Sequence, residues 1–412
     1  MIDAPPDPAG RVHLYRASRA SRRRRLRRRR RLAALGAALV LIVALGAGAW
    51  ALATRGGDTG ADGGAGGPSP TATDIATASP SPSTSPTPSP TPSPPKVIEI
   101  GWVGDTTPGS QYGMPPNGGR ALFASVRAKL RGPDLMIANL EGTYSTGGPS
   151  KCDGQDSGYC FAFQAPPAYA KALSWAGVDL VNLANNHTND YFGRGMQQTT
   201  KALDGAGIEY AGMPGQVTVV KVDGVRVAVV GFSPYPWNAS IIDIPGARRL
   251  VRRAARNADV VVVLMHGGAE GADKIHTPRG TEIAFGENRG ALRAFAHAVI
   301  DAGADLVLGS GPHVIRGIER CKKRLIAYSL GNFAGWDNFG LGGNLSLSGL
   351  LTVRIDEKGR LRGGRWLSLY LGEPGVPRVD SANTSAHLER QLSTSDFTQT
   401  FALDAKGSFS VK

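Results

Sequence analysis

Several features that mark common protein classes are missing from this 412-residue chain. It has three Cys, and no two of them have zinc-ribbon or Cys-x-x-Cys spacing. It also has no Gly-x-x-x-x-Gly-Lys phosphate loop. Gly309-Ser310-Gly311 lacks the Gly-x-Ser-x-Gly spacing of a nucleophile elbow. The sequence therefore argues against a structural zinc site, a P-loop nucleotidase and a serine hydrolase.

The positive charge of the chain is concentrated in one short segment. The formal net charge is +14, and residues 1–31 hold twelve Arg against two Asp, which is +10, so the other 381 residues carry +4. A nucleic-acid-binding domain gathers cations on a folded face. Here the cations lie beside an apolar segment, so we expect no nucleic-acid partner.

The first 96 residues predict a membrane attachment. Residues 1–31 are expected to form a disordered, basic cytoplasmic arm. Residues 32–53 carry no charge and can cross a hydrocarbon core of about 30 Å as a transmembrane helix. The Arg residues before it predict a cytoplasmic N-terminus and an extracellular main domain, and a cleaved signal peptide is the alternative. Residues 54–96, rich in Gly, Ser, Thr and Pro, predict a disordered stalk.

Strand-like and helix-like stretches alternate after the stalk, from residue 97 to 371. This alternation predicts an α/β domain of βαβ units around a mainly parallel sheet. The expected strands cover residues 97–104, 134–139, 178–184, 225–231, 259–265, 304–309 and 324–329. The expected helices cover residues 119–131, 166–176, 193–206, 246–257 and 287–303. Residues 349–371 predict two strands around a tight turn, and residues 372–412 a polar C-terminal appendage with a helix near 384–393.

Cys152 and Cys160 lie at the two ends of a polar, Gly-containing loop. Outside the cytoplasm these two residues could close a local disulfide. Two unpaired thiols are the alternative, and the spacing alone favours neither.

Polar side chains follow five of the predicted strands at the point where each strand ends. They are Asp105, Glu141, the group Asn186, His187 and Asp190, the pair His266 and Glu270, and His313. The carboxyl ends of parallel strands meet at one edge of a sheet, where α/β proteins bind ligands. Carboxylates, amide oxygens and imidazoles are the usual ligands of divalent ions. We therefore predict a metal centre whose ligands are Asp105, Glu141, Asn186, His266 and His313.

The remaining polar residues of these motifs have predicted roles around the metal. His187 is expected to act as a general acid toward a leaving oxygen, with Asp190 orienting it. Two metals about 3.5–4 Å apart would clamp a phosphoryl oxygen. Asn139, Glu270 and Asn332 are predicted to contact substrate. A single Asp after a strand is more often a helix cap, but the repetition at five strand ends favours a site.

On these motifs the chain resembles the bacterial capsule-synthesis CapA (poly-γ-glutamate synthesis) family, a branch of the calcineurin-like metallophosphoesterases. The motifs are Gly104-Asp105, Asn139-Leu140-Glu141, residues 161–167, Ala184-Asn185-Asn186-His187, residues 266–270, Pro312-His313-Val314 and residues 328–333. The resemblance implies a metallophosphatase-like fold of layered sheets flanked by helices over residues 97–371. It also implies a divalent metal (Mn, Zn or Mg, one or two ions), membrane attachment, and a role in making, exporting or anchoring an anionic extracellular polymer.

The chain departs from the superfamily pattern at several positions. Thr107 stands where metallophosphoesterases have a His, Ser310 and Gly311 stand where a further His is common, and Gly267 replaces a frequent Trp. Two imidazoles of a full two-metal site are therefore missing. Three interpretations remain open. The first is a metal-dependent hydrolase of the phosphoesterase type, and the second is a non-catalytic factor that binds the polymer or assembles with other polymer-synthesis proteins. The third, a surface adhesin or sensor, rests only on the predicted anchor and stalk.

Overall fold

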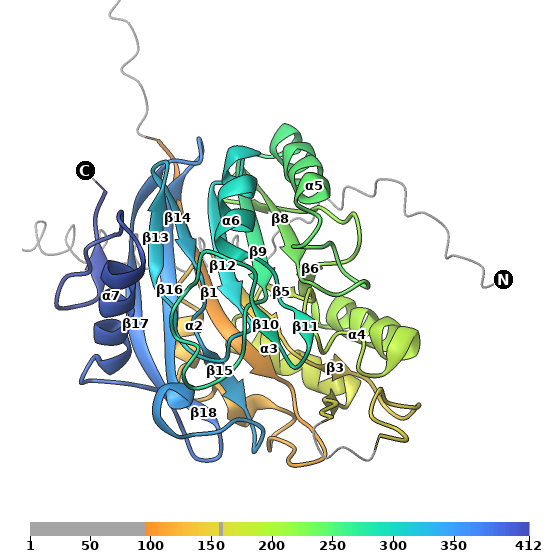
Figure 1. The fold of residues 1–412 in the computed structure, drawn as a ribbon. Helices are drawn as coiled ribbons and strands as arrows, with labels where there is room; N and C mark the ends of the chain where they lie inside the picture. The colour runs from red at the N-terminus through yellow and green to blue at the C-terminus, as the bar shows by residue number, and fades with distance from the viewer. Residues whose placement is uncertain (1–94, 156–159, 412) are drawn as a thin grey trace, which may run out of the picture. The chain divides into compact units, whose positions relative to one another are not determined.

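The computed structural model describes residues 95–155 and 160–411 (Figure 1). The predicted basic arm (1–31) and apolar helix (32–53) lie outside these residues, as does nearly all of the predicted stalk (54–96). None of the helices in the described part is long and apolar enough to cross a bilayer. The predictions for the arm, the transmembrane helix and the stalk stay predictions.

The larger of the two main sheets has nine strands. They are β1 (Val97–Thr107), β2 (Leu135–Leu140), β5 (Leu180–Asn182), β6 (Glu209–Ala211), β15 (Asn332–Gly335), β16 (Leu347–Asp356), β17 (Leu361–Gly372), β18 (Val376–Val379) and β19 (Ser408–Phe409). The order is β18-β17-β16-β1-β2-β5-β6, with β15 beside β1 and β19 beside β17. Strands β15, β1, β2, β5 and β6 are parallel, whereas β16 to β19 pair in antiparallel fashion.

The second sheet has six strands in the order β13-β14-β12-β9-β8-β7. They are β7 (Thr218–Val222), β8 (Val225–Phe232), β9 (Val260–His266), β12 (Leu306–Ser310), β13 (Ile318–Cys321) and β14 (Arg324–Ala327). The four central strands are parallel, and the edge strands β7 and β13 are antiparallel. The parallel βαβ units predicted from the sequence therefore form the centres of two sheets, with antiparallel strands at their edges.

The two sheets face each other across a shared apolar layer. Trp102 and Ile137 of the larger sheet and Val229, Val262 and Leu308 of the smaller sheet belong to it. Helices α3 (Ala170–Ala176) and α4 (Phe192–Ala206) pack on the outer face of the larger sheet, and α5 (Ile244–Asn257) and α6 (Leu292–Asp301) on that of the smaller sheet (Figure 1). This four-layer arrangement confirms the predicted α/β class with layered sheets flanked by helices.

Two predicted helices are shorter than expected. The stretch 119–131 forms two brief turns, η1 (Arg120–Phe123) and α2 (Arg127–Leu130), and Val126 between them has a non-helical φ of −112°. The stretch 287–303 becomes helical only at Leu292. Gly290 has φ 91°, a left-handed conformation that interrupts the helix, and β10 (Ile283–Ala284) and β11 (Glu287–Asn288) form a hairpin before it.

Residues 372–412, which the sequence set apart as an appendage, belong to the same folded unit. They supply β18, β19 and α7 (Thr384–Asp396), and both strands pair with β17. Phe401, Leu403 and Phe409 are buried in the apolar layer between the sheets. Apolar side chains inside this polar segment thus hold it to the core, which the overall composition of the segment did not indicate.

Candidate metal centre

Polar residues of both sheets meet at the carboxyl ends of the central strands. Asp105 lies near the end of β1, in register with Asn332 at the start of β15. His266 ends β9, in register with Ser310 at the end of β12, and Glu141 directly follows β2. The strand ends that the sequence singled out therefore converge, because parallel strands place their carboxyl ends at the same edge.

Asp105 is buried, and both of its carboxylate oxygens have partners. Oδ1 accepts a hydrogen bond from Asn139 Nδ2 at 2.8 Å. Oδ2 accepts one from the Gly311 amide at 3.3 Å and lies 3.2 Å from His313 Nδ1. Burial acts to raise the pKa of Asp105, but His313 and the other neighbours outweigh it, so the pKa is lowered and the carboxylate is the favoured form.

Glu141 is fully buried, and neither of its carboxylate oxygens has a hydrogen-bond partner. Its Oε1 lies 3.7 Å from His266 Nε2 and 3.9 Å from His313 Nε2. Burial, followed by the charge of Asp105, raises the pKa of Glu141 well above its usual value. Buried polar atoms without partners are rare in folded proteins, and each one asks for a ligand, a water or an ion.

His266 is also fully buried, at the end of β9. Its Nδ1 lies 3.2 Å from Ser310 Oγ and 3.3 Å from Asn139 Nδ2, whereas its Nε2 has no hydrogen-bond partner. Burial lowers the pKa of His266 to about 3, which keeps the ring neutral at physiological pH. A neutral imidazole held on one nitrogen is the form that binds metal through the other.

His313 completes the cluster from the turn after β12. Its backbone φ is 60°, a left-handed conformation that residues other than Gly seldom adopt and that is frequent at functional sites. Its Nδ1 lies 2.8 Å from Asn332 Oδ1, and its Nε2 lies 3.7 Å from Glu270 Oε2. Burial opposes protonation of His313, but Glu141 and the other carboxylates outweigh it and raise the pKa well above the usual value.

A second group lies in the loop between β5 and α4. Asn186 Oδ1 is buried and has no hydrogen-bond partner. His187 Nδ1 lies 2.9 Å from Asp190 Oδ2, which leaves Nε2 as the nitrogen available for proton transfer. Burial lowers the pKa of His187, so the neutral ring is favoured. The sequence-predicted contact between His187 and Asp190 is therefore present.

Asparagine side chains fasten this loop to the metal-type cluster. Asn185 Nδ2 donates to the Leu140 carbonyl at 2.8 Å, and Asn182 Nδ2 donates to Asn139 Oδ1 at 2.9 Å. Neither Asn186 nor His187 bonds to Glu141 directly. The structure thus brings Asp105, Glu141, His266 and His313 into mutual contact and holds the Asn186–His187 group beside them through a second layer of amides.

The three predicted substrate-binding residues occupy different positions. Asn139 and Asn332 use their amides on cluster members, an arrangement typical of residues that orient metal ligands. The Glu270 side chain is 17% exposed. Burial acts to raise the pKa of Glu270, but His313 and Arg289 outweigh it and lower the pKa. Substrate contact by these three residues stays a prediction.

Arg289 lies at the site, although no sequence pattern singled it out. Its guanidinium is 1% exposed, and its Nη2 lies 2.5 Å from Glu270 Oε1. The same guanidinium lies 5.7 Å from the centre of the Tyr235 ring. Nearby Gly and Asn residues mark the Arg289 segment as a turn, but nothing in the sequence indicates that the turn folds back over Glu270.

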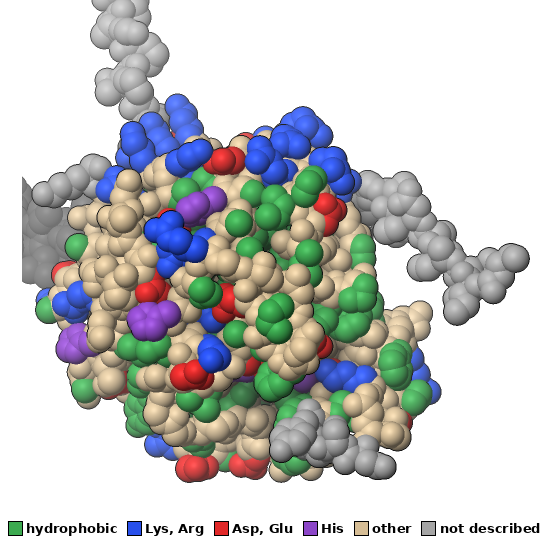
Figure 2. Space-filling model, viewed as in Figure 1, with side chains coloured by type: hydrophobic (Ala, Val, Ile, Leu, Met, Phe, Trp, Pro, Cys, Tyr) green, Lys and Arg blue, Asp and Glu red, His purple; other side chains and the backbone are tan. Residues whose placement is uncertain are grey.

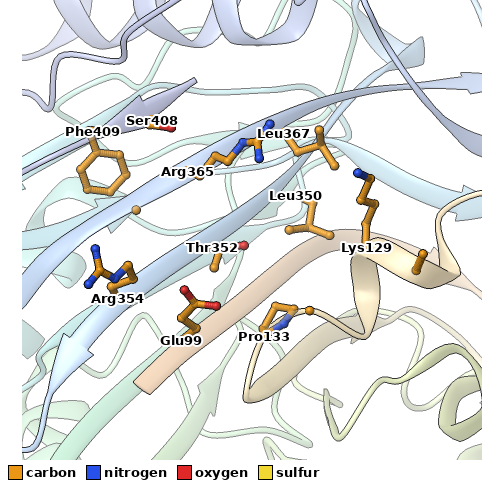
Figure 3. Close-up of a pocket in the computed structure, with 13 residues that line it drawn as sticks. Glu99, Lys129, Pro133, Leu350, Thr352, Arg354, Arg365, Leu367, Ser408 and Phe409 are labelled. Carbon is orange, nitrogen blue, oxygen red and sulfur yellow. The ribbon is translucent and has the colours of Figure 1, made fainter. Parts of the chain in front are cut away.

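Cations also gather on the surface away from this cluster. Figure 2 shows Lys and Arg side chains at the end of the molecule that carries α5, whose exposed residues include Arg252 and Arg256. A pocket of about 460 Å³ lies against β1, β16 and β17 (Figure 3), and Lys129, Arg354 and Arg365 are among the residues that line it. None of the candidate metal ligands lines this pocket, so it is distinct from the centre described above.

The donor atoms of the cluster fit a divalent ion. Ligand atoms of Asp105, Glu141 and His313 all lie within 4.8 Å of one another. The buried atoms without partners include both Glu141 oxygens, His266 Nε2 and Asn186 Oδ1. Carboxylate, imidazole and amide oxygen are the donors that Mn²⁺, Zn²⁺ and Mg²⁺ accept, and the acidic residues supply the charge.

One family of known proteins matches the part of the chain that contains these residues. The family described as Bacterial capsule synthesis protein PGA_cap matches residues 99–335, which is more than half of the chain. The chain belongs to this family. All five predicted metal ligands, together with the rest of the Asn186–His187 loop, lie inside the matched residues, so the family region contains the whole candidate centre.

Two relatives in this family are named for capsule or polymer biosynthesis. The chain is 35% identical over 238 residues to the capsule biosynthesis protein CapA of Bacillus anthracis, covering 52% of this chain and 54% of the relative. It is 29% identical over 262 residues to the PGA biosynthesis protein CapA of Bacillus subtilis (strain 168), covering 58% and 64%. The matched region therefore spans between half and two thirds of these relatives.

Solved structures give weaker similarities. A 5'-nucleotidase precursor from Thermus thermophilus has a TM-score of 0.37 and 16% identity, covering 67% of this chain and 54% of that chain. The NAD nucleotidase of Haemophilus influenzae has a TM-score of 0.37 and 14% identity, covering 76% and 59%.

Proposed function

We propose that this chain is a membrane-anchored, extracellular protein of polymer synthesis, export or anchoring whose site is a metal-dependent hydrolase of the phosphoesterase type. The observation that carries the proposal is Glu141. It is a buried carboxylate with no hydrogen-bond partner, between the free Nε2 of His266 and the ring of His313. A folded protein tolerates such a group where a cation completes it.

The proposed ligands come from both sheets: Asp105, Glu141, Asn186, His266 and His313. A bound divalent ion would supply Lewis-acid polarisation of a phosphoryl or acyl oxygen. Ser310 and Asn332 hold the imidazoles of His266 and His313 from behind, through the Nδ1 atoms. The ring planes are therefore set before any ligand arrives, which lowers the reorganisation that binding requires.

His187 is the proposed proton-transfer residue. Asp190 accepts from Nδ1, so the neutral ring presents Nε2 as a base, and the same nitrogen can return the proton to a leaving oxygen. The lowered pKa of His187 favours the neutral ring, so Nε2 would first accept a proton from water and then donate it to the leaving oxygen. Arg289, paired with Glu270, supplies a buried cation beside the site that suits an anionic substrate.

The proposed location and partners rest on other observations. The uncharged stretch 32–53 after an Arg-rich segment favours an anchor with a cytoplasmic N-terminus. A disulfide joins Cys152 and Cys160, which suits an oxidising compartment outside the cytoplasm. Membership of a capsule-synthesis family supports an anionic extracellular polymer as the substrate and other polymer-synthesis proteins as partners.

The metal is tested first. Purified full-length chain in detergent should contain Mn, Zn or Mg by elemental analysis, or gain thermal stability when one of these ions is added after chelation. Asp105→Ala should lose both the bound metal and the stabilisation. A chain that carries no metal and gains no stability from any of the three ions would refute the proposal.

Hydrolysis is tested next, on bis(p-nitrophenyl) phosphate and on a poly-γ-glutamate chain. His187→Ala should lower turnover by about 10²–10⁴-fold, the usual contribution of a general acid or base, while the metal content stays unchanged. If the metal binds and neither compound is cleaved, the hydrolase part of the proposal fails and the binding part survives.

A second candidate function is non-catalytic binding of an anionic polymer. The pocket in Figure 3 favours it, because Lys129, Arg354 and Arg365 are exposed around it and Glu99 is the one acidic residue among those that line it. Poly-γ-glutamate binding that survives His187→Ala and is lost when Lys129, Arg354 and Arg365 are all replaced by Glu would support this function. Binding lost only through Asp105→Ala would count against it.

A further inference from the structure

The loop between β3 (Thr143–Tyr144) and β4 (Gln164–Ala165) contacts Asp190 from two sides. On one side, the Lys151 amide donates to the Asp190 carbonyl at 2.8 Å, and Lys151 Nζ lies 2.7 Å from Asp190 Oδ1. On the other side, the Phe163 amide donates to Asp190 Oδ2 at 2.7 Å. Asp190 is fully buried, so these contacts and His187 fix its carboxylate.

A disulfide joins the two chain segments that contact Asp190. Cys152 directly follows Lys151, and Cys160 lies three residues before Phe163. The two half-cystines have a Cα–Cα distance of 5.5 Å. The covalent bond therefore holds together the two chain segments that contact Asp190.

Two contacts connect these segments to the imidazole of His187. Asp190 Oδ2, which the Phe163 amide holds, lies 2.9 Å from His187 Nδ1. The Phe163 ring lies 4.3 Å from the imidazole, centre to centre. Because Asp190 can only accept at Oδ2, it selects the tautomer of His187 with the proton on Nδ1.

We propose that Lys151 and the Cys152–Cys160 disulfide form a clamp that positions Asp190 and, through it, the imidazole of His187. Lys151 is a positioning residue, and the disulfide makes the clamp sensitive to reduction. The catalytic consequence rests on the proposed function of His187, whereas the geometric one does not. Opening the disulfide frees the two segments to separate, so Asp190 loses a partner on one side and His187 loses its fixed tautomer.

The clamp is tested by nitrogen-15 NMR of the histidine rings in full-length chain, in detergent and with chelator. In the intact protein, His187, assigned with His187→Gln, should show the Nδ1–H tautomer. Cys152→Ser/Cys160→Ser and Lys151→Met should each give a mixture of tautomers, and Lys151→Arg should restore the single one. His297, bonded to Glu319, is the internal control. Lys171→Met, an exposed Lys on α3, is the matched control.

Reduction of the folded protein gives an independent measurement if the double Cys variant fails to fold. Dithiothreitol transfers two electrons and two protons to the disulfide, which becomes two thiols while the reagent becomes its cyclic disulfide. The tautomer mixture should appear on reduction and disappear on reoxidation. A His187 spectrum that stays unchanged in Lys151→Met and after reduction overturns the proposal, even if the melting temperature falls, because the loop would then only stabilise the fold.

Turnover measurements distinguish a failure of the clamp proposal from a failure of the proposed hydrolase function. If bis(p-nitrophenyl) phosphate is cleaved, Lys151→Met and reduction should each lower kcat about 10-fold with little change in KM, a smaller loss than His187→Ala gives. If the intact chain cleaves nothing, the hydrolase proposal fails, while the tautomer measurement still decides the clamp.

Discussion

Two buried polar clusters of this protein contrast in what their atoms touch. In the metal-type cluster, Glu141 has no hydrogen-bond partner and His266 Nε2 is likewise unpaired. In the second cluster, Arg316 donates to both oxygens of Glu282 at 2.9 and 2.7 Å, and also to the carbonyls of Lys274 and Ala269. The charged groups of one cluster are paired within the fold, whereas the other cluster holds buried atoms without hydrogen-bond partners.

The difference indicates a structural role for the Arg316–Glu282 cluster and supports the proposed metal-binding role of the Glu141 cluster. Glu282 Oε2 also accepts from the Ala269 amide at 2.9 Å, so the Arg316–Glu282 pair joins the segment after β9 to the segment between β12 and β13. The charges of Arg316 and Glu282 are therefore matched by partners within the folded protein. The unpaired atoms around Glu141 add nothing to the metal-free fold and oppose it, which is the pattern expected of a binding site that sacrifices stability for function.

The largest effect should come from breaking the Arg316–Glu282 cluster. Arg316→Ala leaves the Glu282 carboxylate buried without its cation, and we expect the free energy of unfolding to fall by about 3–5 kcal/mol. Chemical denaturation measures this loss. The double variant Arg316→Met/Glu282→Leu should recover most of it, since neither charge is then buried alone. A loss below about 1 kcal/mol in the single variant would contradict the contrast.

A third buried carboxylate, Glu389 on α7, tests whether an unpaired carboxylate oxygen by itself indicates a metal site. Its Oε1 accepts from Ser393 Oγ, its Oε2 has no partner, and burial raises its pKa from 4.5 to about 7. The folded state then binds the proton more tightly than the unfolded state, so this group makes stability fall as pH rises from about 4.5 to 7. Glu389→Gln should lack that fall, at most about 3 kcal/mol.

Thermal unfolding at pH 5 and pH 8 measures the Glu389 effect. Relative to the parent chain, Glu389→Gln should gain stability at the higher pH, and its response to Mn²⁺ should be unchanged because Glu389 lies outside the group of described residues that could hold a metal ion. An equal difference from the parent at both pH values would show that Glu389 does not titrate as described.

Glu141→Gln should change the response to Mn²⁺, whereas Glu389→Gln should change the response to pH. Without metal we expect no loss of stability, because no hydrogen bond is removed. With Mn²⁺ at 100 times its dissociation constant, the parent should gain about 2.7 kcal/mol and the variant should gain little. The matched control is Glu282→Gln, which should lose stability without metal and keep its Mn²⁺ response. A full Mn²⁺ response in Glu141→Gln would remove Glu141 from the ligand set.

The smallest effect concerns a residue that orients a ligand. Asn332→Ala removes the nearer of two partners of His313 Nδ1, the other being Asp105 Oδ2, and we expect Mn²⁺ affinity to fall about 10-fold, or about 1.4 kcal/mol. Isothermal titration calorimetry measures the change. Asn344→Ala is the control, since Asn344 bonds to the Ala272 carbonyl and not to His313. Equal affinity in the two variants would show that Asn332 does not orient the His313 ring for metal binding.

Much of the core fold could be predicted because its signals are local. Apolar runs of strand length, helical periodicity as in α4 and α5, and a polar residue after each strand are all read within a few residues. The antiparallel hairpin of β16 and β17 was predicted as two strands around a tight turn, and the structure confirms it. Strands β7, β13, β18 and β19 and the packing of residues 372–412 were not predicted, because short strands such as β19 are stabilised by a partner far away in the chain.

The sequence by itself determined which side chains stand at the carboxyl ends of the parallel strands, because strand direction and side-chain order are fixed along the chain. Only the tertiary structure decided which of them have partners. Glu141 and Glu282 are both buried acids, yet one is unpaired and the other is matched by Arg316 across 34 residues. Likewise, the spacing of Cys152 and Cys160 left a disulfide and free thiols open, and the fold joined them. Burial and pairing depend on contacts between distant segments, which no local pattern contains.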